Sequence, residues 1–150
     1  MGHTYTKLIY HIIFSTQDRI PLLSLDHRAG IHDYIRGILR GIHCDTLAIN
    51  GVADHVHLAV QIPPALSVSQ AIQTAKTNSS KWLNDTRMFR THFAWQRGFS
   101  AFSVSESSIA RLLDYISNQE EHHRNVPFQE ELLAFLKRYK IDYDARYIWT

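Results

Sequence analysis

The chain has 150 residues, of which 45% are hydrophobic and 20% charged, and its formal net charge is +2. This composition is typical of one globular domain, spanning residues 1–150, and excludes a disordered chain. The single cysteine, Cys44, excludes an internal disulfide and a cysteine-based zinc site. No apolar run is long enough for a membrane span and no signal peptide opens the chain, so we expect a cytoplasmic protein without a membrane partner.

The first half of the chain predicts a strand, a helix and then two further strands. Lys7–Ser15 is rich in β-branched and aromatic residues, as buried strands are. A helix opens at Asp26 and stops near Gly41, because apolar residues recur there at helical spacing. That apolar face comprises Ile31, Tyr34, Ile35, Ile38 and Leu39. Thr46–Val52 and His55–Ile62 are the next two strands.

Two turn signals compete between these last two strands. Ala53 and Asp54 form a short turn directly before His55. Asn50 and Gly51 are also typical of a hairpin turn. The sequence therefore leaves the register of the hairpin open by one or two residues.

The second half of the chain begins with another helix and a fourth strand. Proline cannot donate to a ladder, so Pro63 and Pro64 end the third strand, and Ser67 can cap the helix that follows. The apolar face of that helix holds Val68, Ile72, Ala75, Ser79, Trp82 and Leu83, and the opposite face carries Lys76, Asn78 and Lys81. Gly98–Ser105 alternates apolar with small polar residues, which predicts a half-buried strand.

Two more helices and a tail complete the chain. The apolar residues of the next helix, capped by Ser105 or Ser107, are Ile109, Leu112, Leu113 and Ile116. Pro127 can start the last helix, whose buried side holds Leu132, Leu133 and Leu136. We expect the aromatic tail, Ile141–Thr150, to dock onto the body of the domain.

The order strand, helix, strand, strand, helix, strand predicts an α+β fold. It is the ferredoxin-like split βαβ arrangement, with an antiparallel sheet, helices on one face and extra C-terminal helices. His55–Ile62 then lies inside the sheet. Which face of that strand the helices cover is not evident from the order alone.

The first candidate site is the pair of histidines that opens the third strand. Residues i and i+2 of a strand point to the same face, so His55 and His57 present their imidazoles side by side. Val56, Leu58 and Val60 then point into a core. Paired neutral imidazoles on a rigid strand suit a divalent metal. The alternative is a chance spacing, since the chain has ten histidines.

The second candidate pair is Tyr115 and Gln119, in the helix predicted over Ile109–Glu121. Side chains four residues apart are neighbours on a helix. This pair lies beside the apolar stripe rather than within it, so it can face a neighbouring surface. The alternative is a tyrosine at the rim of a core with a solvated glutamine beside it.

These motifs together resemble the single-tyrosine HUH transposases of small bacterial insertion sequences and their relatives, the REP-associated tyrosine transposases. The resemblance rests on His55-Val56-His57 after Asp54, followed later by Tyr115 and Gln119. It extends over essentially the whole chain. Further matching segments are Tyr10–Thr16, Ser67–Gln70, Trp95–Phe99, Glu120–Arg124 and Tyr147–Trp149.

The resemblance implies a metal-dependent enzyme that nicks and rejoins single-stranded DNA near hairpin-forming ends, through a 5′-phosphotyrosine intermediate. Tyr115 would be the nucleophile, and His55, His57 and Gln119 would hold Mg²⁺ or Mn²⁺. The resemblance also implies a homodimer, in which the tyrosine helix of one subunit serves the histidines of the other, a DNA hairpin as partner and no small-molecule cofactor. The chemistry is sound, because a cation neutralises phosphodiester charge and a phosphotyrosine ester keeps the energy of the broken bond.

Basic residues interleaved with aromatic ones are candidates for DNA contacts. Cations follow the DNA backbone and aromatic rings stack on unpaired bases. The candidates are Lys76, Lys81, Arg87, Arg90 and Arg97. For Trp82 we favour packing in the core. We expect His122 and His123 to be solvated residues at a helix end, where a cationic imidazole meets the helix dipole favourably.

Two other functions stay open at this point. A domesticated relative would bind a DNA hairpin without cutting it. An unrelated metal-dependent phosphoesterase on the same fold would use water and not Tyr115, but no carboxylate-rich metal site is evident in the sequence to support it.

Overall fold

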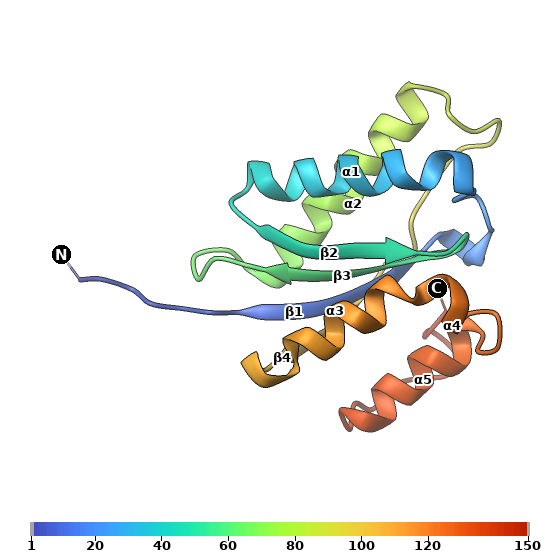
Figure 1. The fold of residues 1–150 in the computed structure, drawn as a ribbon. Helices are drawn as coiled ribbons and strands as arrows, with labels where there is room; N and C mark the ends of the chain where they lie inside the picture. Colours follow the sequence, from blue (N-terminus) through green and yellow to red (C-terminus); the bar gives the residue numbers. More distant parts are fainter. Residues whose placement is uncertain (1, 150) are drawn as a thin grey trace.

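The computed structural model describes residues 2–149 and shows a four-stranded antiparallel sheet between two layers of helices (Figure 1). The strands are β1 (Ile9–Ser15), β2 (Asp45–Gly51), β3 (His55–Gln61) and β4 (Ser100–Val104), and their order across the sheet is β2-β3-β1-β4. Both β1 and β3 are internal strands. The predicted split βαβ arrangement is therefore confirmed.

The first layer of helices covers one face of the sheet with α1 (Leu25–Gly41) and α2 (Val68–Asp85). As predicted, Ser67 caps α2, because its Oγ accepts a hydrogen bond from the backbone nitrogen of Gln70 at 3.0 Å. Alternate residues of β3 and β1 enter the main core beneath these helices. They are Val56, Leu58 and Val60 from β3, and Ile12 and Phe14 from β1.

The second layer consists of α3 (Ile109–Ser117), α4 (Gln119–His122) and α5 (Phe128–Arg138), which lie on the other face of the sheet (Figure 1). Two short 3₁₀ helices, Gln17–Arg19 and Glu106–Ser108, complete the elements. A second apolar cluster joins α5 to the sheet through Ile13, Phe102, Phe128, Leu132 and Leu136. These are the extra C-terminal helices that the sequence predicts, and they cover the histidine-bearing face.

The tail is only partly packed. Ile148 and Trp149 lie against the second apolar cluster, and the guanidinium of Arg19 sits 5.3 Å from the Trp149 ring centroid. Tyr143 is exposed, so the predicted docking holds for the end of the tail only. Thr150 lies outside the described residues.

The β2–β3 hairpin resolves the choice of turn. Strand β2 runs through Asn50 to Gly51, and β3 begins at His55, so the chain turns at residues 52–54. Strand β3 begins at His55 as predicted, and β2 and β3 each end one residue before the predicted bound. In the ladder Asn50 pairs with His57 and Gly51 pairs with Val56, which sets the position of the histidines in the sheet.

One predicted orientation is wrong. Lys76 does not lie on the exposed face of α2: it is 6% exposed, and its Nζ donates to the backbone oxygen of Gly98 at 2.6 Å. The aliphatic stem of a lysine packs as an apolar group, which the helical pattern does not reveal. Burial also lowers the pKa of Lys76 to about 8.

Within residues 2–149, none of the helices has both the length and the apolar composition needed to cross a bilayer.

The turn before the histidines allows a stability prediction at Gly51. A Cβ at this position would meet the backbone oxygen of His55 at 2.2 Å, so Gly51→Ala must displace the chain that carries the histidine pair. We expect it to lower the free energy of unfolding by roughly 1–3 kcal/mol, as overpacking does. Urea unfolding followed by circular dichroism measures the change.

The control is the same substitution in an open helical position. A Cβ at Gly37, inside α1, meets nothing within 4 Å. Gly37→Ala should therefore raise the free energy of unfolding by about 0.5–1 kcal/mol. Equal effects of the two substitutions would contradict this account of the turn.

Candidate functional site

The site begins with two histidines that β3 directs toward the second helical layer. His55 and His57 are both fully buried. The Nδ1 of His55 lies 2.7 Å from the Oδ1 of Asp54, and the Nδ1 of His57 lies 2.7 Å from the Nε2 of His11 on β1. These contacts orient both rings, so that the two Nε2 atoms face the same space beneath α5.

A carboxylate from α5 fills this space. The Oε1 of Glu131 lies 2.9 Å from the Nε2 of His57, 3.1 Å from the Nε2 of His123 and 3.5 Å from the Nε2 of His55. The ligand atoms of these four residues all lie within 4.8 Å of one another. Glu131 is 3% exposed, so its charge is held by protein groups rather than by water.

The pKa shifts in this cluster follow from burial and from the shared carboxylate. Burial disfavours the charged form of Glu131, but hydrogen bonds from His123, His55 and His57 outweigh it and hold the pKa of the carboxyl well below its usual range. Burial lowers the pKa of His57 to about 4 and that of His11 to about 3. For His55, burial is outweighed by Asp54 and Glu131, which raise its pKa.

These charges fix the direction of the hydrogen bonds around His57. An ionised carboxylate only accepts, so the Nε2–H of His57 donates to Glu131. A neutral His57 then accepts at Nδ1 from the Nε2–H of His11. In the other tautomer of each ring, the Nε2 of His11 accepts from the Nδ1–H of His57. His57 can then present the lone pair of its own Nε2. This matters because a metal ligand must be deprotonated at the coordinating atom.

Tyr115 reaches the cluster from α3. Its hydroxyl donates to the Oε2 of Glu131, and it lies 3.3 Å from the Nε2 of His122. Burial, together with the hydrogen bond and negative charge of Glu131, raises the pKa of Tyr115, while Gln119 and Arg138 act in the opposite direction. The phenol is therefore protonated in this arrangement.

Asn50 and Gln119 position the tyrosine helix. The Nδ2 of Asn50, on β2, donates to the backbone oxygen of Ile116 at 2.9 Å, which ties α3 to the sheet. Gln119 is fully buried, and its Nε2 donates to the backbone oxygen of Tyr115 at 3.3 Å. Its Oε1 has no hydrogen-bond partner among the described residues, which is costly for a buried acceptor.

The structure thus brings four predicted site residues into one place within a single chain. They are His55, His57, Tyr115 and Gln119. The roles of these residues and the homodimer stay predictions, because the geometry gives positions and not activities.

The donor set fits a divalent cation. Imidazole nitrogens and a carboxylate are mixed nitrogen and oxygen ligands, which Mn²⁺ accepts readily and Mg²⁺ less ideally. The unpartnered Oε1 of Gln119 is an additional oxygen donor on the helix turn after Tyr115. The contacts of Asp54 with His55 and of His11 with His57 are the outer partners that orient ligating histidines.

Sequence reasoning was wrong about one histidine and missed two other residues. His123 is a half-buried member of the cluster, not a solvated helix end, and His122 contacts both Tyr115 and Glu131. Glu131 and His11 were not predicted. The signal for Glu131 was an acidic residue next to Leu132 on the buried side of a helix. The signal for His11 was its position inside a strand that is buried almost throughout.

The predicted DNA-binding residues lie on the other side of the sheet, on α2 and the segment after it. Lys81 is exposed and pairs with Asp85 at 2.6 Å. Lys81 and Arg97 line one groove beside α2, and Lys76 contributes to its wall. Arg87 and Arg90 follow α2 along the chain and do not line this groove. None of the five lines the hollows around Tyr115.

Comparison with known proteins defines the class. The chain is 28% identical over 129 residues to the transposase of insertion sequence IS200 from Salmonella typhimurium, covering 83% of this chain and 84% of that one. It is 24% identical over 130 residues to the ISDra2 transposase TnpA of Deinococcus radiodurans, covering 80% and 89%. The chain is similar, over most of its length, to DNA transposases.

A family model described as "Transposase IS200 like" matches residues 4–119. The chain belongs to this IS200-like transposase family, whose activity is DNA cleavage and strand transfer. The match ends at Gln119, so His123 and Glu131 lie beyond it.

Solved structures show the same fold. A putative transposase from Deinococcus radiodurans R1 superposes with a TM-score of 0.64 at 25% identity, covering 79% of this chain and 96% of that one. A REP-associated tyrosine transposase bound to a REP hairpin gives a TM-score of 0.62 at 16% identity, covering 84% and 74%. The second likeness shows the fold alone.

The outer partner of His55 allows a metal-binding prediction. Asp54→Ala removes the carboxylate that orients the ring, and losses of this kind typically cost about 10–100-fold in metal affinity. Isothermal titration with Mn²⁺ measures the affinity directly. Asp85→Ala, which removes only a surface ion pair with Lys81, is the matched control and should bind Mn²⁺ as the parent does. Equal affinity of both variants would refute the orienting role of Asp54.

Proposed function

We propose that this transposase nicks and rejoins single-stranded DNA through a covalent 5′-phosphotyrosine at Tyr115. The observation that carries the proposal is the contact of the Tyr115 hydroxyl with the carboxylate that also binds His55 and His57. A nucleophile and a set of metal-binding groups thus converge on one point. A metal-assisted transfer of a phosphodiester uses both.

The proposed metal ligands are His55, His57 and Gln119, with Glu131 and His123 as further donors. Their nitrogen and oxygen atoms support Mn²⁺ or Mg²⁺. A bound divalent cation would neutralise negative charge on the scissile phosphate. The chain's own residues do the rest: Asp54 and His11 orient the ligating rings, and α5 excludes water from them.

The reaction forms a bond between the Tyr115 oxygen and phosphorus and breaks the bond from phosphorus to the 3′-oxygen, which leaves as a hydroxyl after taking a proton. The phenol proton has two acceptors in contact, the Nε2 of His122 and the carboxylate of Glu131. Arg138 favours the phenolate electrostatically. Attack of a free 3′-hydroxyl on the phosphotyrosine reverses these steps and rejoins the strand.

We further propose that DNA hairpins are the substrate ends. The exposed cations Lys81 and Arg97 support a backbone-binding surface on and after α2, and Arg87 and Arg90 extend its positive charge. A REP hairpin is bound by the structurally similar transposase described above. The hairpin would lie along α2 while its unpaired flank reaches Tyr115.

The nucleophile and the metal ligands of this proposal come from one chain. Tyr115 contacts Glu131 and His122, and its ring centroid lies 5.8 Å from that of His57, all within one subunit. We therefore propose a site completed within one chain, in contrast to the site shared between two subunits that the resemblance implies.

The reaction predicts an SDS-resistant protein–DNA band. Purified protein is incubated with Mn²⁺ and labelled single strands that cover the DNA flanking its gene. We expect a covalent band that Tyr115→Phe abolishes, because the oxygen that forms the ester is gone, and that EDTA prevents. Tyr34→Phe is the matched control, since Tyr34 stacks on Trp82 on the opposite face of the sheet and should leave the band unchanged.

Two results would count against the proposal. A band that persists in Tyr115→Phe would show that another residue is the nucleophile. A tight mobility shift on a hairpin with no covalent band under any divalent ion would favour a protein that only binds hairpins.

A further inference from the structure

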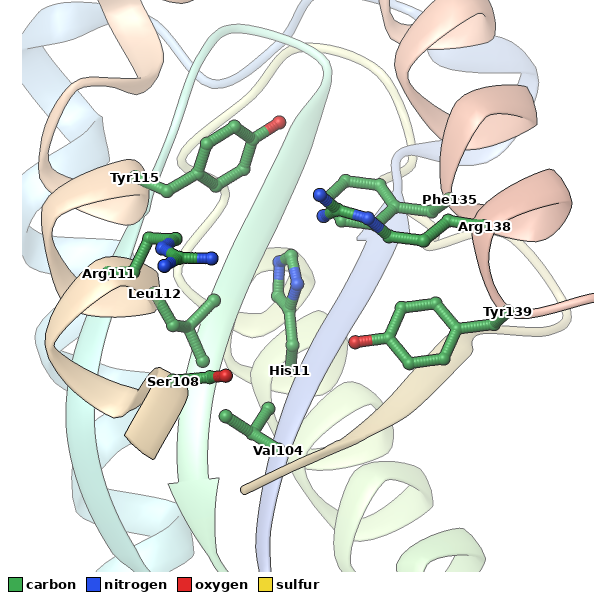
Figure 2. Close-up of a pocket in the computed structure, with 9 residues that line it drawn as sticks. All are labelled: His11, Val104, Ser108, Arg111, Leu112, Tyr115, Phe135, Arg138 and Tyr139. Atoms are coloured by element: carbon green, nitrogen blue, oxygen red, sulfur yellow. The ribbon is translucent and has the colours of Figure 1, made fainter. Parts of the chain in front are cut away.

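A pocket of about 430 Å³ opens beside Tyr115, and Glu131 is not among the residues that line it. It lies between β4, α3 and α5, and His11 forms its floor (Figure 2). Pockets of about 300–1,000 Å³ are the usual size for a small-molecule ligand or a single nucleotide. The proposed reaction uses Tyr115 and Arg138 at its edge but gives no role to the rest of this pocket.

Two arginines face each other across it. Figure 2 shows Arg111, from α3, and Arg138, from α5, extending their guanidinium groups into the pocket from opposite walls. Within residues 2–149 neither guanidinium has a hydrogen bond or an ion pair. Two unpaired arginines in one pocket suit a phosphate, which guanidinium groups bind with paired hydrogen bonds.

The rest of the lining suits a base and a sugar. Leu112, Val104 and Phe135 form apolar walls, and the hydroxyls of Ser108 and Tyr139 point inward (Figure 2). An unpaired base buries its faces against apolar groups and needs hydrogen-bond partners at its edge. The pocket offers both.

Charge distinguishes this pocket from two neighbouring hollows that also reach Tyr115. One of these contains Asp114 and Glu121, and the other contains Glu130 and Glu131, each with a single arginine. The pocket with Arg111 and Arg138 contains no acidic residue. A DNA strand that passes Tyr115 is therefore attracted to this side.

We propose that this pocket binds the unpaired nucleotide next to the scissile phosphate, with its phosphate between Arg111 and Arg138 and its base between Leu112 and Phe135. This proposal rests on the proposed function, because the strand must cross the Tyr115 hydroxyl. The pocket then holds the strand in place for attack and makes the protein select an extruded, single-stranded nucleotide.

The affinity test uses fluorescein-labelled dT12 and fluorescence anisotropy, in the Tyr115→Phe background so that no covalent product forms. Arg111→Ala and Arg138→Ala should each weaken binding about tenfold, as loss of a charged hydrogen bond does. Each should also reduce the salt dependence of binding by about 0.7 in log–log slope. Arg40→Ala, an equal charge change at the end of α1 on the other layer, should leave both quantities within twofold.

A photocrosslink locates the base. A dT12 strand with one 5-iododeoxyuridine is irradiated on the protein, and the attached peptide is identified by mass spectrometry. The proposal requires attachment within residues 135–139 or 108–112. Ser108→Leu, which narrows the pocket without adding an aromatic or sulfur-containing side chain that iodouracil attaches to, should lower this yield at least fivefold while circular dichroism shows an intact fold.

The outcomes separate the two proposals. The pocket proposal fails if adduct formation and dT12 binding do not change in Arg111→Ala and Arg138→Ala, or if crosslinks form only on other segments. Either result would leave the proposed phosphotyrosine reaction unaffected. Absence of both dT12 binding and adduct in the parent protein would overturn both.

Discussion

The burial of one carboxylate, that of Glu131, determines how the C-terminal helices pack on the sheet. An ionised Glu131 without partners would cost several kcal/mol, so α5 must dock where histidines can pair with it. That place is the face of β3 that carries His55 and His57, and His123 closes the cluster from the side. Phe128 and Leu132 then pack on the sheet beside it. Since the family match ends at residue 119, the segment that closes the site lies beyond it.

The same carboxylate governs the protonation of Tyr115, the proposed nucleophile. Its negative charge keeps the histidines together, but it also raises the pKa of the Tyr115 phenol that hydrogen-bonds to it. Arg138 acts in the opposite direction from across the adjoining pocket. The arrangement holds a protonated, unreactive tyrosine next to groups suited to a cation. Partial neutralisation of Glu131 by a bound cation would favour the phenolate, so reactivity would depend on loading the site.

Local patterns predicted most of the fold and the centre of the site. Alternation in β3 placed His55 and His57 on one face and Val56 in the core, and helical spacing paired Tyr115 with Gln119. Glu131 escaped prediction because an acid on a helix is ordinarily solvated, and its burial depends on histidines far away in the chain. Lys76 was placed wrongly for a related reason, since a helical pattern does not show that its ammonium group donates to the Gly98 carbonyl. In both cases a contact between residues distant in the sequence determines whether the charged side chain is buried.

A mixture of two variants, each expected to be inactive alone, tests whether one chain completes its own site. Tyr115→Phe lacks the proposed nucleophile, and His57→Ala lacks a proposed metal ligand. The two proteins are unfolded together, refolded as a mixture and assayed for the covalent DNA band with Mn²⁺, beside wild-type protein treated identically. If each chain completes its own site, the mixture stays inactive, because neither chain has both Tyr115 and His57. Recovery of the band would show that the tyrosine of one subunit serves the histidines of another, and would contradict a site completed within one chain.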